Sequence, residues 1–323
     1  MGNTLVGQGA NEVEPIIDLF ISQNDIVEKL PVDPVTDEDL SVVYKRRKSL
    51  GEADFRALYG TYKESNAEYE KISTTLKPFG SALEIDSVLA IAKQYEDESD
   101  AKAKAASLKL QKYFITGDKT LDQFDGLNRF CIANGQVATV GSGNGLACLK
   151  DATNARAGIN ALEDALDEIR GVDMNLRWLW SKKFQTMVGQ MASVLPNVWY
   201  NPGDIAKGIG PSFAGVEIWT VTRDNLDAYI LNWNETVGSA TDCQSAYLIH
   251  IGSNDGVCWL TRKLEGQSGS EGQPLSYYKM GDLVGVEHGE QLKAMFQILI
   301  GLAFKTPYCA YKISGFRKSA VDA

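Results

Sequence analysis

The chain has 323 residues, of which 44% are hydrophobic and 23% are charged. These fractions are typical of a globular protein with one elaborate domain or two, and they argue against a disordered, collagen-like or coiled-coil chain. Its 42 acidic and 32 basic residues leave a net charge of −10, which disfavours a dedicated nucleic-acid-binding protein. No apolar run approaches the ~20 residues of a membrane span, and the N-terminus lacks the features of a signal peptide. Five cysteines without a C-x-x-C pair favour reduced thiols in a cytoplasmic setting.

The negative charge is concentrated in the first 44 residues. They contain nine acids and one base, Lys29, and account for −8 of the net −10. Ile16, Ile17 and Phe20 lie among these acids, and a free tail does not usually carry such apolar residues. A solvated terminal arm is one interpretation. The apolar residues favour the other, an arm that covers a protein surface, either by folding back on its own chain or by reaching a neighbouring copy.

The mixed pattern of residues 49–80 predicts a long excursion of the chain between two strands. Charges separate its apolar residues, and Gly51, Gly60 and Pro78 interrupt it. The apolar residues at helical spacing are Phe55, Leu58, Tyr59 and Tyr62. Long excursions are uncommon inside a compact domain and are usually functional.

A long amphipathic helix is predicted over residues 85–115, where apolar residues recur every three or four positions until the stop signal of Gly117. It would be about 45 Å long. The stripe begins with Ile85, Val88, Leu89 and Ala92. We interpret the acidic run at residues 96–100 as a solvated face.

A helix–strand–helix block follows. Helical spacing over residues 152–169 precedes a buried strand at 176–180, and Ser181 is predicted to cap a helix over 184–191. Beyond Pro196 the pattern is mostly β, with a hairpin turn at Asn254-Asp255-Gly256 and an exposed loop at 265–274. Strands are predicted over residues 216–221, 246–251, 257–260, 298–304 and 309–313. The fold class is therefore α+β, without the alternation of a doubly wound sheet.

The chain carries no recognisable catalytic motif. It has no Gly-Lys dipeptide for a Walker A loop, and Gly141-Ser142-Gly143-Asn144-Gly145 is not followed by the third glycine of a dinucleotide loop. The chain has only two histidines, His250 and His288, which disfavours a catalytic triad and a metal-dependent hydrolase. We predict no enzymatic activity, no cofactor and no metal site.

Four short patterns and the order of the elements resemble one family. The patterns are Phe124-Asp125-Gly126-Leu127, Phe213-Ala214-Gly215-Val216-Glu217-Ile218, Ser245-Ala246-Tyr247-Leu248-Ile249-His250-Ile251-Gly252, and the closing run from Leu302-Ala303-Phe304 to Ala310-Tyr311-Lys312-Ile313-Ser314-Gly315. Over nearly its whole length the chain resembles the major capsid protein of tailed bacteriophages, with the Hong Kong 97-like (HK97-like) fold that encapsulins share.

This resemblance implies a division of the chain. Residues 1–38 would be the N-terminal arm and residues 39–82 the extended loop. Residues 83–130 and about 240–297 would form the peripheral domain with its long spine helix. Residues 131–239 and about 298–323 would form the axial domain.

The resemblance further implies a structural protein that self-assembles through hexamers and pentamers into an icosahedral shell around double-stranded DNA. Its partners would be other copies of itself, a portal and a separate scaffolding protein, with weak, non-specific DNA contact and no membrane. It would be located in the virion after assembly in the host cytoplasm. The alternatives are an encapsulin-like nanocompartment shell and a cytoplasmic enzyme with an unrecognised carboxylate site.

Contacts between subunits are expected from the arm and the extended loop. The candidates are Ile16, Ile17, Phe20, Lys45, Arg46, Arg47, Lys48, Phe55, Tyr59 and Tyr62. The four consecutive bases can bind phosphate, form a solvated face or pair with acids of an adjacent subunit. We favour pairing, because a shell repeats each small electrostatic contact many times.

Overall fold

The computed structural model describes residues 25–35, 41–49, 51–86, 94–141, 143–169, 175–195, 197–203, 210–262, 284–285 and 291–317. Its helices are α2 (Asp25–Lys29), α4 (Gln94–Thr116), the 3-10 turn η1 (Lys119–Leu121), α5 (Leu127–Ala133), α6 (Ala152–Glu168) and α7 (Lys182–Val194). Its strands are β1 (Val32–Val35), β2 (Ser41–Ser49), β3 (Glu68–Thr75), β4 (Lys77–Asp86), β5 (Val137–Thr139), β6 (Leu146–Ala147), β7 (Leu176–Ser181), β8 (Tyr200–Asn201), β9 (Ser212–Phe213), β10 (Val216–Val221), β11 (Glu235–Val237), β12 (Ala240–His250), β13 (Val257–Arg262), β14 (Val284–Gly285), β15 (Gln291–Phe304) and β16 (Ala310–Arg317).

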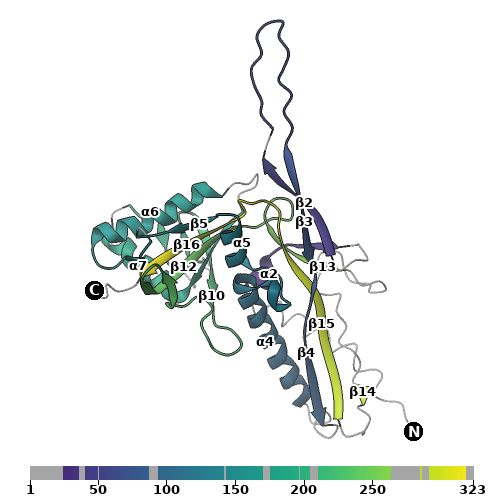
Figure 1. Cartoon of the computed structure of the whole chain (residues 1–323). Coiled ribbons are helices and arrows are strands. Elements are labelled where there is room, and N and C mark those ends of the chain that lie inside the picture. The colour runs from purple at the N-terminus through teal and green to yellow at the C-terminus, as the bar shows by residue number, and fades with distance from the viewer. Residues whose placement is uncertain are drawn as a thin grey trace.

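Two sheets organise the described part of the chain (Figure 1). The larger has nine strands in the order β5-β16-β12-β7-β10-β9-β8, with β11 paired to β12 and β6 to β16. The smaller has five strands in the order β1-β13-β15-β14, with β4 paired to β15. Strands β2 and β3 form a separate two-stranded ribbon that projects from the body (Figure 1).

An aromatic core holds the nine-stranded sheet to helices α6 and α7. Trp178 and Trp180 on β7 are fully buried, and both rings pack against Phe213 on β9. Ser181 ends β7 and caps α7, because its hydroxyl accepts a hydrogen bond from the backbone N–H of Phe184 at 3.1 Å. The predicted helix–strand–helix block, including its cap, is confirmed.

Helix α4 connects the two sheets through a second apolar core. Leu110 and Phe114 are buried on α4 and belong to one cluster with Tyr247 of β12 and Trp259 of β13. The rings of Phe114 and Trp259 lie 5.4 Å apart. The four-residue spacing of Leu110 and Phe114 places both on one face of the helix. None of the helices in the described ranges is both long and apolar enough to span a bilayer.

The long helix begins later than the sequence predicts. Ile85 lies in β4, opposite Leu292, and α4 starts only at Gln94. Strand β4 forms ten register pairs with β15, so tertiary pairing outweighs the local helical spacing at its start. Val88, Leu89 and Ala92 lie outside the described residues.

The hairpin predicted at Asn254-Asp255-Gly256 is wrong. Strand β12 pairs with β16 and β7 in the larger sheet, whereas β13 pairs with β15 and β1 in the smaller one. The chain therefore crosses between sheets here, and a single bridge joins Ile251 to Val257. Gly256 permits the close approach, because a Cβ there would lie 2.7 Å from the carbonyl oxygen of His250. Turn signals indicate a change of direction but do not specify the partner strand.

The strands also divide differently from the expected boundaries near residues 240 and 298. Strand β12, expected in the peripheral domain, lies inside the nine-stranded sheet beside β7. Residues 298–304, expected in the axial domain, belong to β15 and pair with β13 and β4 in the five-stranded sheet. The boundaries differ because strand pairing, rather than order along the chain, decides sheet membership. The predicted loop at residues 265–274 lies outside the described residues.

Part of the expected arm belongs to the core of its own subunit. Strand β1 pairs in parallel with β13, and Ile26, Val27 and Leu30 are only 1–2% exposed. The indole N–H of Trp259 also donates to the carbonyl oxygen of Ile26 at 3.4 Å. Residues 25–35 are therefore not a detached arm, because they fill the space beside α4 and β13.

Candidate assembly surfaces

The β2–β3 ribbon is anchored at its base by one tyrosine. The hydroxyl of Tyr44 accepts a hydrogen bond from the N–H of Phe304 at 3.2 Å and donates to its carbonyl oxygen at 3.4 Å. The ammonium group of Lys305 lies 5.1 Å from the centre of the Tyr44 ring. Burial raises the pKa of Tyr44, so the hydroxyl stays protonated and can make both bonds. The ribbon is thereby attached to the end of β15.

The tip of the ribbon exposes large apolar side chains. Residues 51–67 contain neither helix nor strand, so the helical spacing seen in the sequence does not produce a helix. The exposed fractions are 102% for Phe55, 86% for Leu58, 96% for Tyr59 and 68% for Tyr62. Single exposed apolar residues are ordinary, but a group of them on one projecting segment is a candidate interaction site. Phe55, Tyr59 and Tyr62 thus lie on one segment, residues 51–67, and all three are exposed there.

Local contacts shape this tip. The N–H of Gly60 donates to the carbonyl oxygen of Ala57 at 2.9 Å, and the guanidinium of Arg56 lies 5.1 Å from the Tyr62 ring centre. Tyr59 has a φ of 71°, which is uncommon for a bulky residue. The turn therefore leaves the Tyr59 side chain exposed to solvent, at a small cost in backbone conformational energy.

The four consecutive bases lie on β2 of the same ribbon. The guanidinium of Arg46 contacts Glu70 on β3 at 2.8 Å, and Lys48 lies 3.9 Å from Glu68. Two of the four bases therefore have acidic partners within their own chain, which the sequence hypothesis of intersubunit pairing did not foresee. Lys45 is exposed and stands opposite Lys71 in the register. A role of these bases between subunits stays a prediction.

A buried carboxylate joins α4 to the loop after β10. The Nζ of Lys112 donates to Asp224 at 2.7 Å, and the Asp224 side chain is 2% exposed. Its other oxygen accepts the backbone N–H groups of Leu226 and Ala228, each at 2.9 Å. These hydrogen bonds, the one from Lys112 above all, lower the pKa of Asp224. Sequence analysis missed this junction, because no local pattern pairs Lys112 with Asp224.

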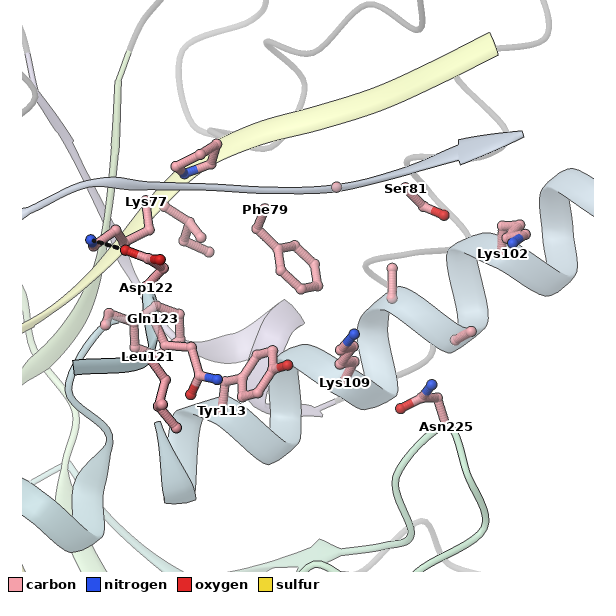
Figure 2. Close-up of a pocket in the computed structure, with 16 residues that line it drawn as sticks. Lys77, Phe79, Ser81, Lys102, Lys109, Tyr113, Leu121, Asp122, Gln123 and Asn225 are labelled. Carbon is pink, nitrogen blue, oxygen red and sulfur yellow. Dashed lines mark ion pairs between the residues drawn. The ribbon is translucent and has the colours of Figure 1, made fainter. Parts of the chain in front are cut away.

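A groove of about 380 Å³ lies between α4 and β4 (Figure 2). Phe79 of β4 and Tyr113 of α4 meet edge to face with their ring centres 6.5 Å apart. Lys102 and Lys109, about two helical turns apart, line the same side of α4. Sequence analysis missed this groove too, although the spacing of the two lysines on one helix face was a usable signal.

The cysteines and the metal-ligating side chains of the described residues were the remaining candidates for chemistry. All five cysteines are buried, and burial raises the pKa of Cys148, Cys258 and Cys309 to about 12. Within the described ranges, no group of three metal-ligating side chains occurs. His250 is 1% exposed in β12, which fits its interpretation as a structural strand residue.

The sequence matches no model of a protein family and no curated protein sequence. Solved structures do match. The holo-SrpI encapsulin from Synechococcus elongatus gives a TM-score of 0.59 at 11% identity, covering 100% of this chain and 94% of that one. A structure of Mycobacterium phage Bobi gives a TM-score of 0.56 at 12% identity and covers 90% of this chain and 89% of that one. A virus-like particle from Pyrococcus furiosus gives a TM-score of 0.54 at 9% identity and covers 95% of this chain and 100% of that one.

The chain has the HK97-like fold. This confirms the fold that the short motifs and the order of elements suggested. The similarity to these structures describes the path of the backbone. At identities of 9–12%, it does not describe the side chains on the surface of this chain. The assembly surfaces must therefore be argued from the residues of this chain.

Proposed function

We propose that the chain is the major capsid protein of a tailed phage, which self-assembles through hexamers and pentamers into an icosahedral shell around double-stranded DNA. The observation that carries this proposal is the ribbon that projects from the body (Figure 1). Its tip exposes Phe55, Tyr59 and Tyr62. Such a surface is costly in water and becomes favourable when a second copy covers it. The HK97-like fold supports the same function.

A shell subunit must contact several neighbours, each through roughly 800 Å² of its surface. Within this proposal, the arm and the ribbon supply contact area that a compact body lacks. The proposed intersubunit contacts are Ile16, Ile17 and Phe20, which lie outside the described residues, and Lys45, Arg46, Arg47, Lys48, Phe55, Tyr59 and Tyr62 on the ribbon.

The same proposal assigns the parts of the subunit by their sheets. The five-stranded sheet with α4 would be the peripheral domain, and the nine-stranded sheet with α6 and α7 the axial domain. The β2–β3 ribbon would be the extended loop, and the residues before Asp25 the arm. These assignments keep the expected parts and move their boundaries to the observed strand pairing.

The further partners follow from the same function. A portal and a separate scaffolding protein would accompany assembly in the host cytoplasm, and the finished protein would be located in the virion. A net charge of −10 favours weak, non-specific contact with the enclosed DNA. The role is structural rather than enzymatic.

Expression of the full chain, followed by gel filtration and electron microscopy, tests the proposal. Closed particles of megadalton size with nuclease-protected DNA, when the chain is produced with its phage partners, are the expected result. A stable monomer at high protein concentration would contradict it.

A nanocompartment shell is the second candidate. Its support is the encapsulin similarity, which extends over 100% of this chain. Mass spectrometry of purified particles separates the two, because a nanocompartment would contain a stoichiometric cargo protein and no protected DNA.

A further inference from the structure

We propose that the groove between α4 and β4 binds the acidic, apolar segment of residues 12–20 from the arm of a neighbouring copy. This inference rests on the proposed shell function, because it requires a neighbour. It adds a defined receptor site to the arm and names the residues that recognise it.

The rim of the groove is basic. Lys102 and Lys109 project from α4 along it, and neither has an acidic partner among the described residues (Figure 2). Lys77 enters from β4 and lies 3.5 Å from Asp122, the acid that lines this groove. Three lysines against one aspartate leave an excess of positive charge in a chain whose net charge is −10. The groove therefore attracts an acidic segment.

The floor of the groove is apolar. The edge-to-face pair of Phe79 and Tyr113 forms its centre, with Ala105 and Ala106 of α4 beside it. Leu121 lines one end and is 66% exposed. A volume of about 380 Å³ is within the range of specific binding sites and accepts a few apolar side chains.

Residues 12–20 match both properties. Glu12, Glu14 and Asp18 supply negative charge, and the segment contains no base, since the first base of the chain is Lys29. Its apolar residues are Val13, Ile16, Ile17, Leu19 and Phe20. Pro15 disfavours a helical conformation for the residue before it, which suits an extended peptide in a groove.

The ribbon tip is the less suitable occupant. Residues 51–67 carry the acids Glu52, Asp54 and Glu64, but also the bases Arg56 and Lys63, which the lysines of the groove would repel. The tip therefore has a net charge of only −1, against −3 for residues 12–20. The arm segment, by contrast, offers acids alone. Charge thus assigns the groove to the arm and leaves the ribbon tip for a different surface.

The length of the arm permits contact with a neighbour. The described chain begins at Asp25 in α2, so an extended chain carries residues 20 and 12 up to about 17 and 43 Å away. The longer reach exceeds the radius of gyration of about 20 Å expected for a chain of this length. A segment that leaves its own subunit can therefore cover the groove of the next.

Disulfide trapping between two full-length variants tests the assignment. One variant carries Leu19→Cys and the other Ala105→Cys, and they are mixed before assembly and mildly oxidised. The five native cysteines are buried, so their thiols contribute little background. We expect disulfide-linked dimers at about ten times the yield obtained when Lys104→Cys replaces Ala105→Cys. Lys104 is a matched control, because it is exposed on α4 and does not line the groove.

Charge reversal provides a second readout. Lys102→Glu with Lys109→Glu should lower the dimer yield roughly three- to tenfold, and Glu12→Lys with Glu14→Lys in the arm should restore it. A folding defect in the groove variant would not be rescued by a change in another molecule. Failure of the rescue would contradict direct pairing.

The remaining outcomes are also decisive. Particles that form normally without arm–groove dimers would overturn this inference and leave the shell function standing. A disulfide that forms within one chain of a Leu19→Cys, Ala105→Cys double variant, but not in the mixture, would assign the segment to its own subunit. Cross-linking of the groove cysteine to a different protein would identify another occupant. Absence of any particle would overturn both proposals.

Discussion

At Asp224 a single carboxylate accepts hydrogen bonds from α4 and from its own loop. Lys112 holds it from the helix, and the backbone N–H groups of Leu226 and Ala228 hold it from the loop. Because every accepted bond favours the ionised form, the pKa of Asp224 lies below its usual value. This charge therefore adds a polar contact to the apolar core that holds α4 against the nine-stranded sheet.

Replacing Asp224 by Asn should lower the free energy of unfolding by about 1–3 kcal/mol near neutral pH. The estimate is below that for a fully buried pair, because the Lys112 side chain is 40% exposed. Chemical denaturation of the two proteins measures the difference. Asp227→Asn is the control, since Asp227 is 79% exposed in its pair with Arg223, and we expect no measurable change there.

The pH dependence of this difference has a defined sign. A carboxylate whose folded pKa is lowered stabilises the fold above its unfolded pKa of about 3.9, and it loses this effect as pH falls through the folded pKa. The gap between wild type and Asp224→Asn should thus be constant above about pH 5 and narrow below pH 4. A gap that persists unchanged to pH 2 would show that the charge is not its origin.

At the scale of elements, α4 and the β2–β3 ribbon are stabilised in different ways. Helix α4 buries Leu110 and Phe114 in the core that connects both sheets. The ribbon is bound to the body near its base by Val42 and Tyr44 and leaves its tip uncovered. Substitutions in α4 should therefore affect folding, and substitutions in the tip should affect assembly.

The proline test of the helix belongs at Leu110, because Leu89 lies outside the described residues. Leu110→Pro should abolish the folded subunit, since proline inside a helix costs about 3 kcal/mol or more and a buried leucine is lost as well. Circular dichroism and the yield of soluble protein report the result. Lys104→Ala on the exposed side of α4 should fold normally.

Replacing Phe55, Tyr59 and Tyr62 together by Ser should leave the subunit folded and prevent stable shells. The three side chains are 68–102% exposed, so the isolated subunit loses almost no buried area. In a shell, each covered aromatic residue contributes roughly 1.5–3 kcal/mol. Thermal unfolding measures the stability of the subunit, and light scattering measures the assembly of shells. Normal assembly of the variant would show that the tip is not part of the interface.

Replacing Lys45, Arg46, Arg47 and Lys48 by Ser should slow or misdirect assembly if these bases pair with a neighbour. The wild-type rate should then fall as salt screens the contact. Because Arg46 and Lys48 have partners at Glu70 and Glu68, a Glu68→Gln, Glu70→Gln variant separates loss of the ribbon's internal pairs from loss of an intersubunit contact. Unchanged kinetics of the Ser variant at low ionic strength would indicate a solvated face.

At the scale of the whole molecule, the described residues combine three buried apolar clusters with segments that the subunit does not cover itself. Residues 25–35 belong to the first group, and the ribbon tip to the second. A truncation series locates the boundary at the N-terminus. Deleting residues 1–24 should leave a folded subunit that forms unstable or aberrant shells.

Deleting residues 1–30 should in addition destabilise the subunit, because Ile26, Val27 and Leu30 leave the core. Each of these side chains contributes roughly 1.5–3 kcal/mol when fully buried. Unfolding of the full chain and both truncations by denaturant gives the comparison. If the two truncated proteins were equally stable, α2 would not contribute to the core and would belong to the arm.

Some features could be derived from the sequence because neighbouring residues decide them. Ser181 caps α7 through a group three residues away, and the buried strand before it is marked by Trp178 and Trp180. The long excursion at residues 49–80 could be predicted, because its glycines and charges are not typical of a segment in a compact core. The same local signals, in their order along the chain, were enough to suggest the HK97-like fold.

Other features arise from residues that meet only in the tertiary structure. Helical spacing placed Ile85 in a helix, but ten pairs with β15 place it in β4. Turn residues indicated a hairpin at Gly256, but the partners of β12 and β13 lie in different sheets. The groove between Phe79 and Tyr113 and the pair of Lys112 with Asp224 likewise join distant segments. Local sequence determines turns, caps and periodicity, whereas backbone pairing and burial between distant segments select the partners, because their free energies depend on residues that no local pattern contains.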